Sequence, residues 1–460
     1  MSPVGSRTAV CMLCILVGCG HSSASRQQAT THAAKESPAV TNETRAREFV
    51  DLLVAKRFSD ASGSFDGAMK AALPADKLEQ VWATLVSQAG PFQTITGSRA
   101  RNRDAYEIVY VSCKFEKVAL DAKIVFDRAH LISGLFFVPA EEPAADASTP
   151  PPYARRESFE EQDISIGTGE WKLPGTLTMP RGPGPFPALV LVHGSGPNDR
   201  DETLGPNKPF RDLAWGLASR GIAVIRYDKR TKVYGAKLAG VRDFTVQQEV
   251  IDDAVAAAAA ARSTARIDPR RVFVLGHSLG GNLAPRILAG DAAIAGAVVL
   301  AGSTRPMARA ILEQVTYIAE LDGEISKEEA TNIEALKTEL ARMEEPSFSA
   351  ASEAVLGVPA SYWLDLRGYD PVATAKALTR PLLILQGGRD YQVTRADFEG
   401  WERGLKGLKN VELQLYPELN HQFIAGTGKS SPDEYSKAGN VAVEVVDDVA
   451  RWILSSPPRK

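Results

Sequence analysis

Short, largely apolar runs recur along the second half of the chain, separated by longer stretches with helical patterning. These runs stand at residues 186–192, 222–226, 272–275, 297–301 and 381–386. Each has the length of a strand and little polar face, which is typical of a strand buried on both sides in a parallel sheet. Residues 246–261 form an alanine-rich helical segment, and residues 411–416 alternate like one further strand. Strands that alternate with helices predict an α/β fold with a mainly parallel sheet.

The first third of the chain has a different pattern. Apolar side chains recur at helical spacing at Ala46, Phe49 and Leu53, and again at Leu78 and Trp82. Four stretches of strand-like residues follow, at 92–96, 106–113, 118–126 and 131–137. Helices followed by successive antiparallel strands predict a small α+β domain ahead of the α/β domain.

A change of composition separates the two predicted domains. Residues 139–155 are rich in proline and alanine, which is typical of a linker. We therefore expect the α+β domain over 43–138 and the α/β domain over 156–460. The interval between the last two apolar runs is too long for one helix, so it predicts a helical cap at about 303–375. Helical patterning within this interval lies near 304–321, 326–343 and 349–356.

The beginning of the chain has the pattern of a secretion signal. Its apolar run at 9–17 is too short to span a bilayer, and it ends in Leu-Val-Gly-Cys19. This ending resembles a bacterial lipobox, in which the cysteine is lipidated and becomes the first mature residue. We therefore expect a signal peptide at 1–18, a flexible tether at 19–42 and a lipid anchor in the bacterial cell envelope. An ordinary cleaved signal or a short anchor is the alternative.

Composition limits the partners and the redox chemistry. The 460 residues are 44% hydrophobic and 24% charged, which is ordinary for a soluble globular protein. A formal net charge of −3 gives no basic footprint for nucleic acid. Processing at Cys19 would remove Cys11 and Cys14 and leave Cys113 as the only free thiol. We therefore expect no structural disulfide.

The five residues G-H-S-L-G at 276–280 carry the most specific chemical signal. They follow an apolar strand and precede a helix-like stretch, which is the context of a nucleophile elbow. In such an elbow the backbone turns sharply and exposes a serine hydroxyl, and glycines on both sides relieve the crowding. The pattern predicts Ser278 as a nucleophile.

A serine nucleophile of this kind needs a histidine base and a carboxylate. The apolar run at 381–386 leads through two glycines and an arginine into Asp390, and the strand at 411–416 leads to His421. Both residues lie beyond the carboxyl ends of predicted strands, where open α/β sheets place their sites. We expect His421 to take the proton from Ser278, and Asp390 to orient His421.

Other residues fit these roles less well. Asp365 and Asp370 precede the strand at 381–386 rather than follow it. Asp228 ends an earlier strand and is more typical of a structural partner for an arginine such as Arg230. His193 ends a strand on the opposite side of the expected site.

A second glycine-containing loop is the candidate for holding an oxyanion. The strand at 186–192 runs into His-Gly-Ser-Gly at 193–196. One backbone N–H from such a loop and one from the residue after the nucleophile form the oxyanion hole in folds of this kind. The candidates are the N–H groups of Ser195 and Leu279.

Taken together, these segments resemble the α/β-hydrolase superfamily, in particular bacterial carboxylesterase-like and serine aminopeptidase-like members. The resemblance spans about 160 to 456, and the first domain is similar to cone-shaped nuclear-transport-factor-like or cystatin-like domains. The segments that carry the α/β-hydrolase resemblance are H-G-S-G-P-N-D-R-D at 193–201, R-Y-D-K-R at 226–230, G-H-S-L-G-G at 276–281, G-G-R-D at 387–390 and L-N-H at 419–421.

The resemblance implies hydrolysis of small or medium acyl esters through a serine triad. A serine aminopeptidase-like peptidase or an acyl thioesterase is the alternative activity, and a non-catalytic surface-binding lipoprotein is the alternative class. No His, Cys or Glu cluster has the spacing of metal ligands, so we expect neither a metal nor an organic cofactor. The expected partners are an acyl ester and, through Cys19, a membrane, while the oligomeric state stays open.

Overall fold

The computed structural model describes residues 41–103, 106–140, 150–238 and 241–459. The predicted signal peptide at 1–18, the lipidation site Cys19 and nearly all of the tether at 19–42 lie outside the described residues. The chain forms two compact units, divided between residues 145 and 146. Each unit has its own hydrophobic core.

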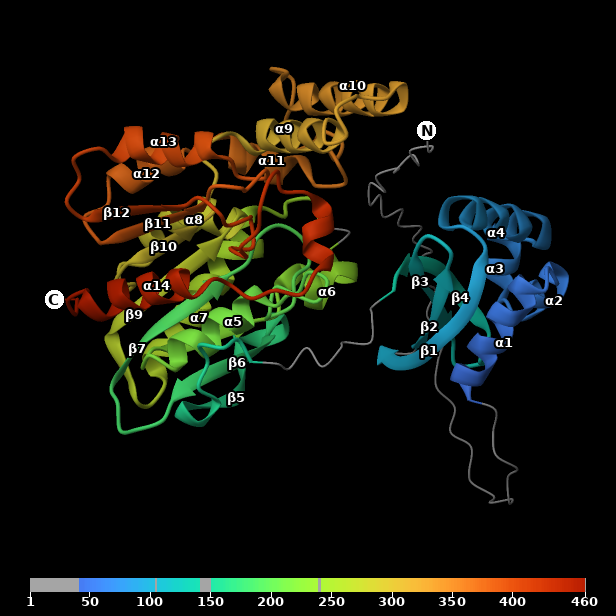
Figure 1. The fold of residues 1–460 in the computed structure, drawn as a ribbon, viewed down its shortest axis with the longest axis horizontal. Helices are drawn as coiled ribbons and strands as arrows, with labels where there is room; N and C mark the ends of the chain where they lie inside the picture. The colour runs from blue at the N-terminus through green and yellow to red at the C-terminus, as the bar shows by residue number, and fades with distance from the viewer. Residues whose placement is uncertain (1–40, 104–105, 141–149, 239–240, 460) are drawn as a thin grey trace. The chain divides into compact units, whose positions relative to one another are not determined.

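The first unit packs helices on one face of an antiparallel sheet whose strands follow in chain order. Figure 1 shows the helices in blue beside the curved sheet. Its core joins Phe49 and Trp82 of two helices to Val111 and Ile124 of the sheet. The elements are α1 (Asn42–Val54), α2 (Phe58–Gly63), α3 (Gly67–Ala72), α4 (Ala75–Ala89), β1 (Phe92–Arg103), β2 (Tyr106–Phe115), β3 (Ala119–Phe126) and β4 (Ile132–Pro139).

Strand β1 runs seven residues past the end expected from the sequence. Register shifts between Phe92 and Thr94 and between Ile95 and Gly97 interrupt its pairing with β2. A bulge breaks the alternation of side chains, so the period of two cannot be followed through it. The strand continues into polar residues, among them Arg99, which forms an ion pair with the buried Asp121.

The second unit is built on an eight-stranded sheet of order β12-β11-β10-β9-β7-β8-β6-β5. Strands β7 to β12 pair in parallel, while β6 pairs antiparallel with both β5 and β8. The strands are β5 (Phe159–Ile166), β6 (Leu173–Pro180), β7 (Phe186–Val192), β8 (Ala223–Tyr227), β9 (Ile267–His277), β10 (Ala297–Leu300), β11 (Leu382–Gly387) and β12 (Val411–Tyr416). The predicted α/β fold with a mainly parallel sheet is confirmed.

Helices cover both faces of this sheet (Figure 1). One face packs α5 (Pro209–Ala218) and α14 (Val443–Ser455) into a core that includes Leu191, Phe273 and Trp452. The other packs α7 (Asp252–Ser263), α8 (Leu279–Gly290) and α13 (Arg395–Leu405) around residues such as Val190 and Val274. Helix α6 (Arg230–Leu238) follows β8, and a π-helical turn, Gln247–Ile251, leads into α7.

A helical cap stands between β10 and β11. It contains α9 (Met307–Ala319), α10 (Lys327–Ala341), α11 (Ala360–Arg367) and α12 (Pro371–Lys376). The cap has a small core of its own that includes Phe348, Val355 and Trp363. The prediction of a helix at 349–356 is wrong, since these residues form turns and bends. Leu356 and Gly357 have positive φ angles of 51° and 74°, which a right-handed helix does not allow. The next helix begins only after Pro359.

The second unit begins earlier than the composition suggests. The Tyr153 hydroxyl donates to the carbonyl of Val441 at 2.7 Å, and the Arg155 N–H donates to the Ser219 hydroxyl at 2.8 Å. The Tyr153 ring also lies against Gly216 of α5. These residues of the predicted linker are therefore part of the second unit.

A chain that begins at residue 150 should fold by itself, because the second unit has a complete core. A chain that begins at residue 157 loses the Tyr153 contacts, which contribute about 2 kcal/mol through buried area and a hydrogen bond. Its melting temperature should be lower by several degrees when both chains are followed by circular dichroism. Equal melting temperatures would show that Tyr153 adds nothing to the fold.

Candidate active site

A strained turn at Ser278 joins β9 to α8. Ser278 has φ 55° and ψ −113°, a conformation that costs on the order of 1–3 kcal/mol in a non-glycine residue. Its flanking glycines have no room for a side chain. A Cβ at Gly276 would clash with the carbonyl oxygen of Gly280, and a Cβ at Gly280 would clash with that of Val192. The glycines of the motif are therefore explained by backbone contact.

His421 and Asp390 form a close buried pair. His421 Nδ1 lies 2.6 Å from Asp390 Oδ2, and the Asp390 side chain is fully buried. The other carboxylate oxygen accepts hydrogen bonds from the N–H groups of Gln392 and Val393, at 2.8 and 3.0 Å. Backbone donors thus fix the carboxylate, and the carboxylate fixes the imidazole with Nδ1 as its donor.

The elbow and the histidine loop are also joined directly. His277, the residue before Ser278, donates through Nε2 to the backbone carbonyl of His421 at 2.9 Å. The rings of these two histidines lie 4.7 Å apart between centroids. Ser278, Asp390 and His421 follow the carboxyl ends of β9, β11 and β12, which meet at one edge of the parallel sheet. Among the residues that the structure describes, the Ser278 hydroxyl has no hydrogen-bond partner.

The competing carboxylates are engaged elsewhere. Asp365 pairs with Arg286 at 2.8 Å, and Asp370 caps the start of α12. Asp228 pairs with Arg200 at 3.0 Å. The prediction that Asp228 pairs with Arg230 is wrong. Arg230 lies in the first turn of α6 and pairs with Asp253 of α7 instead.

His193 is a structural residue of the loop after β7. Its ring is buried against Phe210 and Tyr227, and its Nε2 lies 3.0 Å from the carbonyl oxygen of Asp199. Burial lowers the pKa of His193 to about 4, against the opposing attraction of Glu202. The imidazole is therefore neutral at pH 7 and donates to the loop that it supports.

Two backbone N–H groups near Ser278 remain free. The N–H of Gly194 donates to Glu202 Oε1 at 2.6 Å, and that of Gly280 donates to the His193 carbonyl at 3.1 Å. Within the described ranges, the N–H groups of Ser195 and Leu279 have no partner. The loop lies against Ser278, since a Cβ at Gly194 would stand 3.1 Å from the Ser278 Cβ. The two predicted oxyanion donors are thus unengaged.

The sequence did not single out Glu202, which lies behind the elbow. Its Oε2 is 2.8 Å from His277 Nδ1, and both side chains are buried. Burial alone would lower the pKa of His277, but the Glu202 carboxylate outweighs it and raises that pKa. Burial would raise the pKa of Glu202, and His277 lowers it instead. Nothing in the polar run 198–202 distinguishes this carboxylate from its neighbours.

Arg389, directly before Asp390, ties two loops together. It forms an ion pair with Glu434 and donates through Nε to the carbonyl of Gly428 at 2.9 Å. Glu434 also accepts from the Asn420 side chain at 3.1 Å, next to His421. The loops that carry Asp390 and His421 therefore share one partly buried contact.

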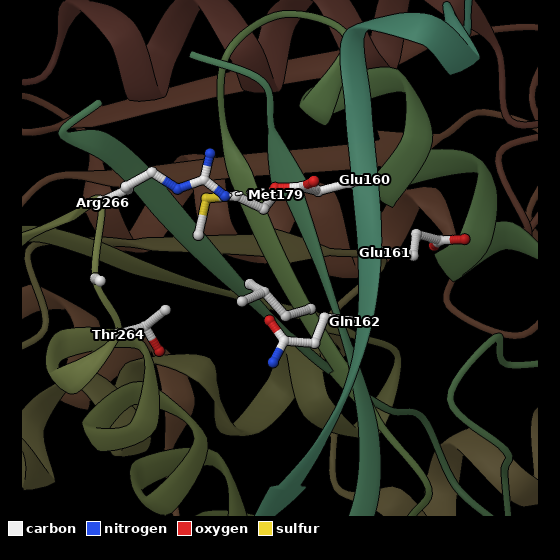
Figure 2. A pocket seen from close by; sticks show the side chains of 8 residues that line it. Glu160, Glu161, Gln162, Met179, Thr264 and Arg266 are labelled. Atoms are coloured by element: carbon white, nitrogen blue, oxygen red, sulfur yellow. Dashed lines mark hydrogen bonds and ion pairs between the residues drawn. The ribbon is translucent and has the colours of Figure 1, made fainter. Parts of the chain in front are cut away.

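A cavity of about 460 Å³ lies at the other end of the sheet. Figure 2 shows it between β5, β6 and the segment before β9, with the Arg266 side chain reaching toward Glu160 beside Met179. Arg266 precedes β9, whereas Ser278 follows it, so this cavity is separate from the candidate active site. Its charged groups are paired, since Arg266 lies 2.6 Å from Glu160.

The described part of the chain holds no group of three or more His, Cys, Asp or Glu residues that could bind a metal ion. Over the same residues, the helices are too short or too polar to cross a membrane.

Comparison with known proteins adds family relations. A model described as the alpha/beta hydrolase family matches residues 189–438, and one described as a protein of unknown function (DUF3887) matches 46–135. Esterase EstD of Thermotoga maritima is 42% identical over 406 residues, which cover 88% of this chain and 94% of the relative.

Solved structures with lower similarity were also found. Est1E from Butyrivibrio proteoclasticus is 18% identical, with a TM-score of 0.41, over 64% of this chain and 98% of that one. The Pyrococcus furiosus esterase PF2001 is also 18% identical, with a TM-score of 0.39, over 64% of this chain and 92% of that one.

The buried neutral His193 should make the second unit less stable in acid. Its pKa is about 4 when folded and about 6.5 when unfolded, so the unfolded state binds more protons between these values. Stability is therefore lost as the pH falls from 6.5 toward 4. His193→Gln should reduce the loss in unfolding free energy between pH 7 and pH 5 by about 2 kcal/mol, measured with urea.

His130→Gln, which changes a histidine of the first unit, is the matched control. An acid loss in His193→Gln as steep as in the unchanged protein would contradict the assignment of a neutral buried imidazole.

Proposed function

The chain belongs to the alpha/beta hydrolase family, and from this premise we propose that it is a serine esterase that cleaves small or medium acyl esters through a covalent acyl-enzyme. The relation to an esterase over 88% of the chain supports the reaction class. The observation that carries the proposal is the buried contact between His421 Nδ1 and Asp390 beside the strained turn of Ser278.

The residues act in a defined order in the proposed mechanism. The Ser278 hydroxyl attacks the ester carbonyl while His421 Nε2 takes its proton, and Asp390 stabilises the resulting imidazolium. The free N–H groups of Ser195 and Leu279 bind the oxyanion of the tetrahedral intermediate. His421 then gives its proton to the leaving alcohol. A water molecule, activated by the same histidine, releases the acid from Ser278.

The cap supports a limit on acyl size. Tyr317 of α9 stacks on Tyr391, the residue after Asp390, with ring centroids 5.1 Å apart. Its hydroxyl donates to the carbonyl of Ser430 at 2.8 Å, in the loop that follows His421. A cap helix therefore contacts both loops that carry triad residues. We therefore expect the cap to restrict the size of the acyl group.

The attachment to a membrane is a separate part of the proposal. Cys19 in the lipobox-like segment would carry the lipid, and the tether at 19–42 would connect it to the folded units. The esterase would then work in the bacterial cell envelope with the triad facing soluble or interfacial esters. The first unit contributes no catalytic group in this proposal, since every proposed triad member lies in the second unit.

Replacing Ser278 with Ala should abolish covalent labelling by a fluorophosphonate probe and lower kcat on a short p-nitrophenyl ester by at least ~10³. The triad acts as a unit, so Asp390→Asn should lower kcat by a similar order, because it favours the wrong imidazole tautomer. Ser347→Ala is the matched control, since this serine is exposed in the cap. Labelling that persists in Ser278→Ala would remove Ser278 from the mechanism.

A panel of substrates separates the esterase from its alternatives. We expect kcat/KM to peak for p-nitrophenyl esters of short or medium chain and to fall for long chains. Amino-acid arylamides and acyl thioesters should be poorer substrates. A preference for an arylamide would indicate a peptidase, and a preference for a thioester would indicate a thioesterase.

Expression in a bacterial host should give a protein that incorporates labelled palmitate and partitions into the detergent phase. Cys19→Ala should prevent both while the activity on a soluble ester stays unchanged, because every proposed triad residue belongs to the second unit. A fully soluble wild-type protein with an N-terminus other than Cys19 would contradict the lipid anchor.

A further inference from the structure

A buried lysine contacts the back of the loop that holds the candidate oxyanion donor. Lys229, between β8 and α6, donates through Nζ to the carbonyl oxygen of Gly194 at 2.7 Å. This carbonyl belongs to the same peptide unit as the N–H of Ser195. A trans peptide is planar, and its C=O and N–H point in opposite directions. A donor that fixes the carbonyl therefore aims the N–H away from the lysine.

The same loop is held from several sides. The backbone N–H of Lys229 donates to the Asn198 carbonyl at 3.0 Å. The Asn198 side chain in turn donates to the carbonyls of Gly194 and Ser195, at 3.2 and 3.0 Å. On the other side, Glu202 accepts the Gly194 N–H. The orientation of the 194–195 peptide is thus determined before any substrate binds.

The lysine is deeply buried and paired with one carboxylate. Its side chain is 2% exposed, and its Nζ lies 3.0 Å from Glu249 Oε1. Glu249 sits in the π-helical turn before α7 and accepts a hydrogen bond from the Tyr362 hydroxyl of α11 at 2.6 Å. π-Helical turns are rare and occur frequently at functional sites. Removing an ammonium group from water is costly even when it is paired.

A neutral donor could hold the same carbonyl without that cost. The Asn198 amide already supplies one. What an ammonium adds is charge: a charged donor makes a stronger hydrogen bond and polarises the peptide dipole, so that the opposite N–H becomes more positive. In a site shielded from water, such a preorganised dipole stabilises a developing oxyanion more than a neutral ester.

We infer that Lys229 is a positioning residue for ester hydrolysis: it orients and polarises the Gly194–Ser195 peptide, whose N–H binds the oxyanion. The inference rests on the proposed function, because it assumes that Ser195 donates to the oxyanion formed at Ser278. Lys229 does not touch the substrate. Its pair with Glu249 also links the oxyanion loop to the cap through Tyr362.

The test compares three substitutions in the full-length protein. Lys229→Met removes the donor and the charge, Lys229→Gln keeps a donor without the charge, and Lys229→Arg keeps both. For a short p-nitrophenyl ester, kcat should fall by about 100-fold in Lys229→Met, the magnitude seen when one oxyanion donor is lost. The value of kcat should be highest in Lys229→Arg, lower in Lys229→Gln and lowest in Lys229→Met, with KM changed by less than about threefold.

Inhibitor binding separates this role from a structural one. An arylboronic acid forms a tetrahedral anion on Ser278, whereas the corresponding carboxamide imitates the neutral ground state. In Lys229→Gln the affinity for the boronic acid should fall by the same factor as kcat/KM, and the affinity for the carboxamide should be retained. Equal losses for the two inhibitors, or unchanged kcat in the Gln variant, would overturn the inference.

Lys232→Met is the matched control, because this lysine is exposed on α6. It should leave all these quantities unchanged. Circular dichroism and fluorophosphonate labelling of Ser278 establish that each variant is folded. If Lys229→Met does not fold, the comparison between Lys229→Gln and Lys229→Arg still tests whether the charge of Lys229 contributes to kcat. If Ser278 is unlabelled even in the unchanged protein, the proposed function fails instead of this inference.

Discussion

The close approach of backbone segments at Ser278 is the constraint on which the rest of the site depends. Gly280 lies so near the carbonyl of Val192, at the end of β7, that no side chain fits between them. The Ser278 N–H donates to the Leu300 carbonyl of β10 at 2.9 Å, which ties the turn to the next strand. Burial of the surrounding sheet offsets the strain of the positive φ. The hydroxyl is therefore presented by a rigid frame and not by a mobile loop.

Buried charge pairs behind this turn hold backbone rather than substrate. Glu202 joins the elbow residue His277 to the N–H of Gly194, and Lys229 holds the carbonyl of the same residue. A buried ion pair is weak evidence for stability, because the desolvation of its charges opposes their attraction. These pairs instead fix the peptides that surround Ser278. Fixed dipoles need no reorganisation when charge develops in the transition state.

Much of this arrangement could be predicted from the sequence, for a physical reason. Strands β7 to β11 are mostly buried on both faces, so they leave apolar runs, while the edge strand β12 alternates. The residues that follow these strands mark the site edge. Strand β5 escaped detection because it is an edge strand with mostly exposed polar residues. The helix expected at 349–356 fails at Leu356, whose positive φ no periodicity reveals. Glu202 and Lys229 were missed because their roles arise from contacts between distant segments.

The central claim is that the acyl group of the ester is transferred to Ser278 before water releases it as the carboxylic acid. The most direct test is rapid acid quench of the enzyme with a short ester in the first turnover, followed by mass spectrometry of its peptides. The account predicts a mass increase of one acyl group on the peptide that contains Ser278, accompanied by a burst of alcohol release. Turnover without any acylated peptide, or with the acyl group on another residue, would contradict it.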